Sequence, residues 1–195
     1  MKRLLTMTIL FLGLSTSYPA EEPVRCLPKP DYRRDASDPD WLVQAVQFHG
    51  HLGPWATAGL RAGMCARRAV GAEGYFDLEV TVEGPLVKPP QSCFLDGVQV
   101  STGATWGKRN LKWIEANQIV VRVTNIRTGK VAEVRPTPTL IRLVTSFKPR
   151  PKTVAAAEVQ GQDEQLSEDR QAETVARQVA RLPEKEILDV ALPQP

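Results

Sequence analysis

Strong charge of one sign and long apolar runs are both missing from this chain of 195 residues. The formal net charge is +3, which becomes +1 once Lys2 and Arg3 are discounted as part of an N-terminal leader. A nearly neutral protein has no electrostatic basis for binding nucleic acid or an anionic membrane surface. The apolar N-terminal stretch, 4–14, is well short of the roughly 20 residues that a membrane-spanning helix needs. We therefore expect no nucleic-acid partner and no transmembrane segment in the mature protein.

The first residues instead have the pattern of a secretory signal peptide. Two basic residues precede the apolar stretch, and three small residues ending at Ser17 follow it. Residues 1–17 are therefore predicted to be a cleaved signal peptide, with cleavage as late as Ala20 as the second choice. The alternative is an uncleaved membrane anchor, which the shortness of the apolar stretch disfavours. Export would place the protein in the periplasm or outside the cell.

Cysteine is scarce, since Cys26, Cys65 and Cys93 are the only three. Their spacing matches no iron–sulfur ligation pattern, which excludes such clusters. In an oxidising compartment, an odd number leaves at least one thiol free, metal-bound or paired with another chain. Cys65 lies within a predicted helix, and we interpret it as a buried inert thiol; a disulfide to either of the other two is the alternative.

The alternation of polar and apolar residues predicts one small α+β domain at 38–147. Before it, 18–37 holds four prolines among charged residues and is predicted to be an extended leader. After it, 148–195 is charged and has too few apolar residues for a core of its own, so we expect a partly helical or disordered tail. Within the domain we expect helices at 39–50, 54–70, 92–100 and 139–147, and strands at 76–83, 118–124 and 130–135.

Histidine is scarcer still, because His49 and His51 are the only two and both stand in one tripeptide. Alternate residues can turn both imidazoles toward one point where the backbone is extended, and neutral imidazole is a ligand for zinc and similar ions. The alternative is a pair of surface or hydrogen-bonded histidines that bind nothing.

Cys93 favours the metal interpretation. It follows Ser92 at a predicted helix start, where the helix dipole favours a thiolate. With His49 and His51 it makes three ligands, the number typical of a catalytic zinc site with an open position. Asp96, one turn further along, is a fourth ligand, a partner that orients a histidine, or a charge that stabilises the start of the helix.

The loop at 102–108, TGATWGK, looks like a phosphate-binding loop, but its glycines are one residue too close. Arg109 also stands where a serine or threonine should hold magnesium. These departures exclude a nucleotide-binding loop of that type. Lys108 could still bind a small anion or form a salt bridge.

Four motifs within 41–147 have the order and spacing of a known family. They are FHGHLGP at 48–54, GLRAG at 59–63, SCFLDGVQ at 92–99 and STGATWGK at 101–108. On these motifs the chain resembles FmdE, a family named for formylmethanofuran dehydrogenase. The resemblance implies a mixed β-sheet flanked by helices and a cleft that can bind zinc. It does not extend to formate-level oxidation, which needs a molybdenum or tungsten pterin cofactor and iron–sulfur clusters.

Two positions depart from the family pattern, in which members often have cysteine where Gly53 and Ala104 stand. Without these thiols, His49, His51 and Cys93 are left to hold an ion. Many members of the family also have a second, cysteine-rich zinc-finger domain, whereas no cysteine follows Cys93 in this sequence.

The function that these observations favour is an exported metal-binding or accessory protein with a divalent ion as its ligand, zinc first and copper second. One alternative is a small metal-dependent enzyme that acts on an anionic molecule, with metal-bound water as the nucleophile and Lys108 as the anion clamp. Another is a non-catalytic binding or assembly protein that forms a homodimer or recruits a protein partner through its tail. The resemblance places all three near one-carbon metabolism.

Overall fold

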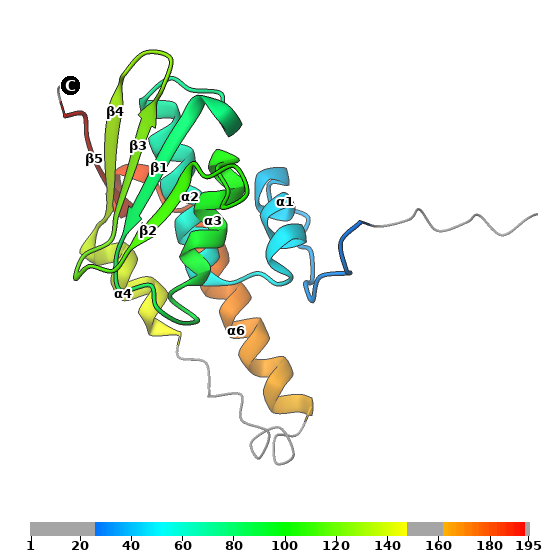
Figure 1. The fold of residues 1–195 in the computed structure, drawn as a ribbon. Helices are drawn as coiled ribbons and strands as arrows, with labels where there is room; N and C mark the ends of the chain where they lie inside the picture. The colour runs from blue at the N-terminus through cyan, green and yellow to red at the C-terminus, as the bar shows by residue number, and fades with distance from the viewer. Residues whose placement is uncertain (1–25, 148–161, 194–195) are drawn as a thin grey trace, which may run out of the picture.

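The computed structural model describes residues 26–147 and 162–193, with side chains in the second stretch from Glu168 onward (Figure 1). These residues form two layers, a five-stranded sheet and a group of helices that packs against one of its faces. The predicted α+β class, with a mixed sheet flanked by helices, is confirmed. The predicted signal peptide, 1–17, lies outside the described residues. In the two stretches above, no helix is long and apolar enough to cross a membrane.

The sheet has the order β2-β1-β3-β4-β5, in which β1 and β2 are parallel and all other neighbours are antiparallel. Its strands are β1 (Leu78–Glu83), β2 (Leu111–Ile114), β3 (Val120–Asn125), β4 (Val131–Pro136) and β5 (Leu188–Ala191). Alternation along the strands turns valines such as Val82 and Val121, which pair across β1 and β3, into the core. Three of the strands, β1, β3 and β4, confirm sequence predictions.

The other face of the sheet is charged. Arg122 contacts Glu133 at 2.6 Å and Glu83 at 3.6 Å, and Arg135 contacts Glu133 at 2.6 Å. Burying these groups beneath a second layer of helices would remove them from water at a cost in free energy. This face therefore stays exposed, and the core lies on the helical side alone.

Helices α2 (Pro54–Ala69) and α3 (Cys93–Thr102) cross at short range because glycines stand at the contact. A Cβ on Gly59 would lie 1.9 Å from the carbonyl oxygen of Phe94, and a Cβ on Gly97 would lie 2.0 Å from a carbonyl oxygen of α2. Only a hydrogen atom fits at either position. The contact fixes the start of α3, where two of the predicted site residues stand, against α2.

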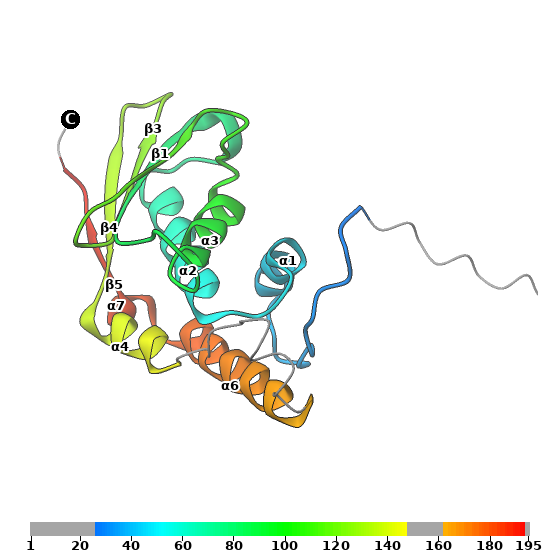
Figure 2. The same ribbon diagram turned by 60° about the horizontal axis from the view of Figure 1, so that its bottom comes forward.

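Residues 162–193 pack onto the domain, whereas the sequence predicts a partly helical or disordered tail for 148–195. Ala176, Val179 and Ile187 are completely buried, and β5 extends the sheet. The remaining helices are α1 (Asp40–His49), α4 (Pro138–Ser146), α6 (Gln162–Arg181) and α7 (Glu184–Ile187), with a single turn, η1 (Tyr75–Asp77), before β1. The apolar residues of α6 are too few for a separate core, but they complete the existing one where α6 packs against α2 and α4 (Figure 2).

The end of α6 is held by Arg61, which belongs to the GLRAG motif. Its guanidinium donates to the carbonyl oxygens of Val179, Ala180 and Leu182 at 3.1, 2.6 and 2.9 Å. Carbonyls at the end of a helix have no partner within the helix, and Arg61 supplies one from α2. The GLRAG motif therefore has a structural role, because its Arg61 joins α2 to the end of α6.

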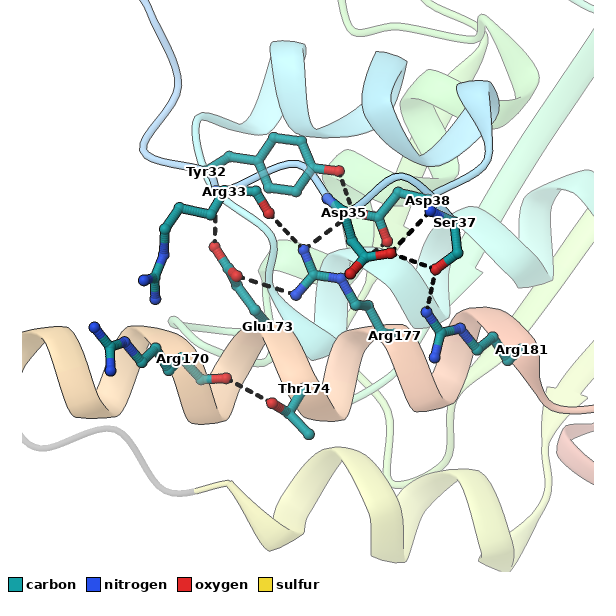
Figure 3. Close-up of polar contacts among 10 residues, drawn as sticks. All are labelled: Tyr32, Arg33, Asp35, Ser37, Asp38, Arg170, Glu173, Thr174, Arg177 and Arg181. Carbon is teal, nitrogen blue, oxygen red and sulfur yellow. Dashed lines mark hydrogen bonds and ion pairs between the residues drawn. The ribbon is translucent and has the colours of Figure 1, made fainter.

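A buried ion pair holds the C-terminal half of α6 to the N-terminal segment (Figure 3). Arg177 donates to the two carboxylate oxygens of Asp38 at 2.9 and 3.0 Å and to Glu173 at 3.0 Å. Tyr32 donates to the same aspartate at 2.5 Å. Burial alone would raise the pKa of Asp38, but the hydrogen bonds from Arg177 and Tyr32 lower it to about 2.

Candidate metal and ligand site

Two helix ends bring three of the predicted site residues, His49, Cys93 and Asp96, together. His49 is the last residue of α1, where Gly50 adopts a left-handed conformation (φ 92°) and ends the helix. Cys93 is the first residue of α3, and Asp96 follows it by one turn. His51 lies just beyond α1, in a single β-bridge to the N-terminal segment.

His49 is the most buried of these groups. Its Nδ1 lies 2.7 Å from Oδ2 of Asp96, and its side chain is only 8% exposed. The other ring nitrogen, Nε2, is buried and has no hydrogen-bond partner among the described residues. Buried polar atoms are nearly always paired, so the orphaned Nε2 is a candidate position for a ligand.

The protonation of His49 depends on its neighbours. Burial alone would lower the pKa of the imidazole, but the interactions with Asp96 and Cys93 raise it to about 9. The sequence leaves three roles open for Asp96, and the short contact to Nδ1 supports the one in which it orients a histidine.

His51 packs beside His49, with ring centroids 4.5 Å apart and planes tilted by 41°. Both Nε2 atoms face the same small space at Gly53. A Cβ built on this glycine would lie 3.1 Å from Nε2 of His51 and 3.7 Å from Nε2 of His49. The Gly53 backbone is extended (φ −109°, ψ 142°), a conformation open to any residue, so the glycine matters here for its size.

A pocket of about 550 Å³ opens beside His49, within the size range of ordinary small-molecule sites. Its polar lining comes from the end of α1 and the start of α3 and comprises His49, Ser92, Cys93, Asp96 and Gln99. Its apolar lining comprises Pro89, Leu95, Trp106, Leu111 and Trp113. Three of the four predicted metal ligands therefore share one pocket.

The remaining predicted residues, His51 and Lys108, are not part of this lining. The Lys108 ammonium lies 5.7 Å from the centre of the exposed Phe76 ring and 3.4 Å from the hydroxyl oxygen of Thr105. Over the described ranges, no three His, Cys, Asp or Glu side chains form a ready set of metal ligands. Coordination of an ion by both histidines would require movement of the side chains.

The backbone amides at the start of α3 are not free to stabilise a thiolate at Cys93, contrary to the sequence prediction. The amides of Cys93 and Phe94 donate to the carbonyl oxygens of Pro90 and Gln91, and the Ser92 side chain makes no capping hydrogen bond. The first-turn amides are thus already engaged. The predicted activation of the thiol by a free helix N-terminus has no support in these contacts.

All three cysteines are free thiols. Cys65 is buried within α2, as predicted, and burial raises the pKa of its thiol to about 12. A thiol with this pKa stays protonated and inert at neutral pH. Cys93 is therefore the cysteine that the fold presents to a pocket.

One family model covers nearly all of these elements. The family described as "FmdE, Molybdenum formylmethanofuran dehydrogenase operon" matches residues 48–189. The chain belongs to the FmdE family. The match confirms the resemblance carried by the four motifs. It also places α6, α7 and the start of β5 within the FmdE domain, whereas the sequence prediction ends that domain at Phe147.

Two known proteins illustrate what this FmdE domain is similar to. A "Probable S-adenosyl-L-methionine-binding protein" from Archaeoglobus fulgidus is 28% identical over 89 residues, which are 46% of this chain. The match covers only 24% of that protein's length. The crystal structure of a "tungsten formylmethanofuran dehydrogenase subunit e (fmde)-like protein" from Syntrophus aciditrophicus aligns with a TM-score of 0.47 and 16% identity, over 80% of this chain and 71% of that one.

Sequence reasoning missed the apolar half of the FmdE pocket. Trp106 lies in the loop from which only Lys108 is predicted as a site residue, and Trp113 lies in β2, which no pattern predicted. The position of Trp106 inside the STGATWGK motif is the signal that could have drawn attention to it. Trp113 carries no such signal, because a four-residue strand is too short to show a period.

Proposed function

We propose that this FmdE domain binds a divalent metal ion, with zinc as the favoured ion, through His49, His51 and Cys93. The observation that carries the proposal is the buried Nε2 of His49, which has no hydrogen-bond partner among the described residues. His49 itself lines the same pocket as Cys93. Two imidazole nitrogens and one thiolate sulfur suit zinc.

The surroundings of the histidines fit this role. A carboxylate on the far nitrogen of a ligating imidazole fixes its orientation and raises its basicity, and Asp96 stands at that place on His49. The space at Gly53 lies in front of both Nε2 atoms. His51 is exposed and its ring lies beside that of His49.

Binding of an ion at Nε2 requires His49 to lose a proton, because only the neutral imidazole is a ligand. The raised pKa of His49, about 9, means that this proton is present at neutral pH. Zinc binding should therefore release protons and should strengthen as the pH rises toward 9. The histidine range of about 6 to 7, expected for an unperturbed imidazole, does not apply to His49.

Zinc titration of the full chain against a chromophoric chelator tests the proposal. His49→Ala, His51→Ala and Cys93→Ser should each weaken zinc binding by at least about tenfold. Cys65→Ser is the matched control, because it removes a thiol that does not line the pocket, and it should leave the affinity unchanged. Equal affinities for all four variants and the parent chain would overturn the metal site.

The pocket favours a second candidate, a small metal-dependent enzyme, because an ion beside a cavity could polarise a bound substrate. A screen of anionic small molecules for turnover by the zinc-loaded chain distinguishes this enzyme from a metal carrier. The relative named for S-adenosyl-L-methionine makes that compound a further ligand to include in the screen.

We also propose that the protein is exported, on the basis of residues 1–17. The mass of the mature protein tests this, with a start at Tyr18 or Glu21 as the expected result. A product that retains Met1 and sediments with membranes would show that the apolar stretch is an anchor.

A further inference from the structure

The apolar half of the pocket contains an unusually exposed aromatic side chain. Trp106 lies in the loop between α3 and β2, and it is 60% exposed although it lines the pocket. An indole in water exposes a large apolar surface, which a bound ligand can cover with a gain in free energy. Trp106 is therefore available for contact with a ligand rather than engaged in the core.

The other indole of the pocket is fixed. Trp113 is half-buried on the edge strand β2, and its Nε1 donates to the carbonyl oxygen of Gly84 at 3.1 Å. Its one polar atom is thus satisfied within the protein, which leaves the ring as an apolar wall. Leu95 and Leu111 complete this side of the pocket.

The polar half of the pocket determines which chemical group the other end of a bound ligand must carry. The side chain of His49 is more than nine-tenths buried, and its Nε2 has no hydrogen-bond partner among the described residues. An atom with a lone pair fits here in two ways: it accepts a hydrogen bond from Nε2 in the metal-free protein, or it occupies the open position of a bound ion. Only the second way rests on the proposed metal site.

We propose that this pocket binds a planar aromatic molecule that carries a carboxylate, with the aromatic ring against Trp106 and the carboxylate at His49. A flat ring stacks on an indole face, whereas a puckered ring of the same size cannot make full contact with it. The pocket volume of about 550 Å³ accommodates a two-ring molecule of this class. If the proposed metal-dependent activity holds, such a molecule is the substrate class that this pocket selects.

The test compares naphthalene-2-carboxylate with decahydronaphthalene-2-carboxylate by calorimetric titration into the full chain. The two acids share a carbon skeleton and a charge, but only the first is planar. The planar acid should bind at least about tenfold more tightly, as expected for stacking on one aromatic side chain. Trp106→Ala should abolish this preference, and Trp106→Phe, which keeps a flat ring, should retain most of it.

Phe76→Ala is the matched control, because Phe76 is 71% exposed and does not line the pocket. It should leave the preference for the planar acid unchanged. The proposal is overturned if neither acid binds, if both bind equally, or if Trp106→Ala retains the preference. It is also overturned if Phe76→Ala removes the preference as completely as Trp106→Ala does.

Titrations with and without zinc separate this proposal from the metal site. A preference for the planar acid in a protein that does not bind zinc supports the aromatic pocket and overturns only the metal proposal. Zinc binding without any preference for the planar acid supports the metal proposal and overturns the aromatic pocket.

Discussion

Gly53 shows how much the candidate site depends on the absence of a side chain. Its extended backbone places no restriction on residue type, and its α-hydrogens face the Nε2 atoms of His49 and His51. A methyl group at this position would enter the space that a shared ion needs. A thiol there would enter the same space, but as a ligand for the ion.

Two substitutions of Gly53 should therefore affect zinc affinity to different extents. Gly53→Ala should weaken binding by about tenfold or more, because its Cβ would push against His51 at 3.1 Å. Gly53→Cys should bind more tightly than Gly53→Ala, since the added sulfur compensates for the lost space. The chelator competition assay measures both. Gly107→Ala is the control, because its Cβ would meet only the Thr105 hydroxyl oxygen, at 3.8 Å. Similar affinities for the alanine and cysteine variants would show that the ion does not occupy the space at Gly53.

The protonation of His49 provides a second test at the scale of single residues. The pKa of His49 is raised from 6.5 to about 9, so its stabilising contribution is complete below pH 6.5 and is lost as the pH rises through 9. Asp96→Asn removes a negative charge that favours the imidazolium, and the pKa of His49 should fall. NMR titration of the ring protons of His49 and His51 measures the pKa of His49 directly. A His49 pKa that is the same in Asp96→Asn as in the parent chain would exclude Asp96 as the orienting carboxylate.

A buried charge pair joins α6 to the N-terminal segment. Asp38 and Arg177 have side chains that are 1% and 16% exposed, so removal of one partner leaves a buried charge unpaired. Arg177→Gln should lower the free energy of unfolding by about 3 kcal/mol or more, measured by urea denaturation. The low pKa of Asp38, about 2, means that the stabilisation from this carboxylate is present above pH 4 and is lost as the pH falls through 2.

Arg122→Gln is the matched control for that loss. Arg122 also pairs with carboxylates, but its side chain is 45% exposed on the open face of the sheet. Exposed pairs contribute little, so this substitution should cost less than about 1 kcal/mol. If the two substitutions had equal effects, the contact between α6 and the N-terminal segment would be an ordinary surface contact.

The sequence predicts the longer elements of this fold and misses the short ones. Helices α1, α2, α3 and α4 and strands β1, β3 and β4 are found within a few residues of their predicted ranges, because each contains enough residues to show a period. Strands β2 and β5 have four residues each, and their place in the sheet depends on pairing with β1 and β4. Pairing between distant segments is not visible in a local pattern.

For the whole molecule, the predicted end of the domain at Phe147 is too early for the same reason, because contacts between distant segments are not visible in a local pattern. The segment after Phe147 has few apolar residues, which is the composition of an extension. Composition does not show that Val179 and Ile187 fill space in a core built by other elements. The site follows a similar rule: motifs identify His49 and Cys93, but the apolar wall at Trp113 becomes visible only when β2 packs beside α3.

The C-terminal segment, 162–193, folds as one unit with the rest of the domain. A chain shortened to end at Phe147 loses α6, α7 and β5, exposes the buried face of α2 and leaves β4 as an unpaired edge. It should lack the cooperative thermal transition of the full chain or melt far below it, because burial by Val179, Ile187 and Leu188 is lost. A chain that ends at Ala191 keeps every described element and should melt with the full chain. Equal melting temperatures for the two shortened chains would show that 38–147 folds by itself, as its composition suggests.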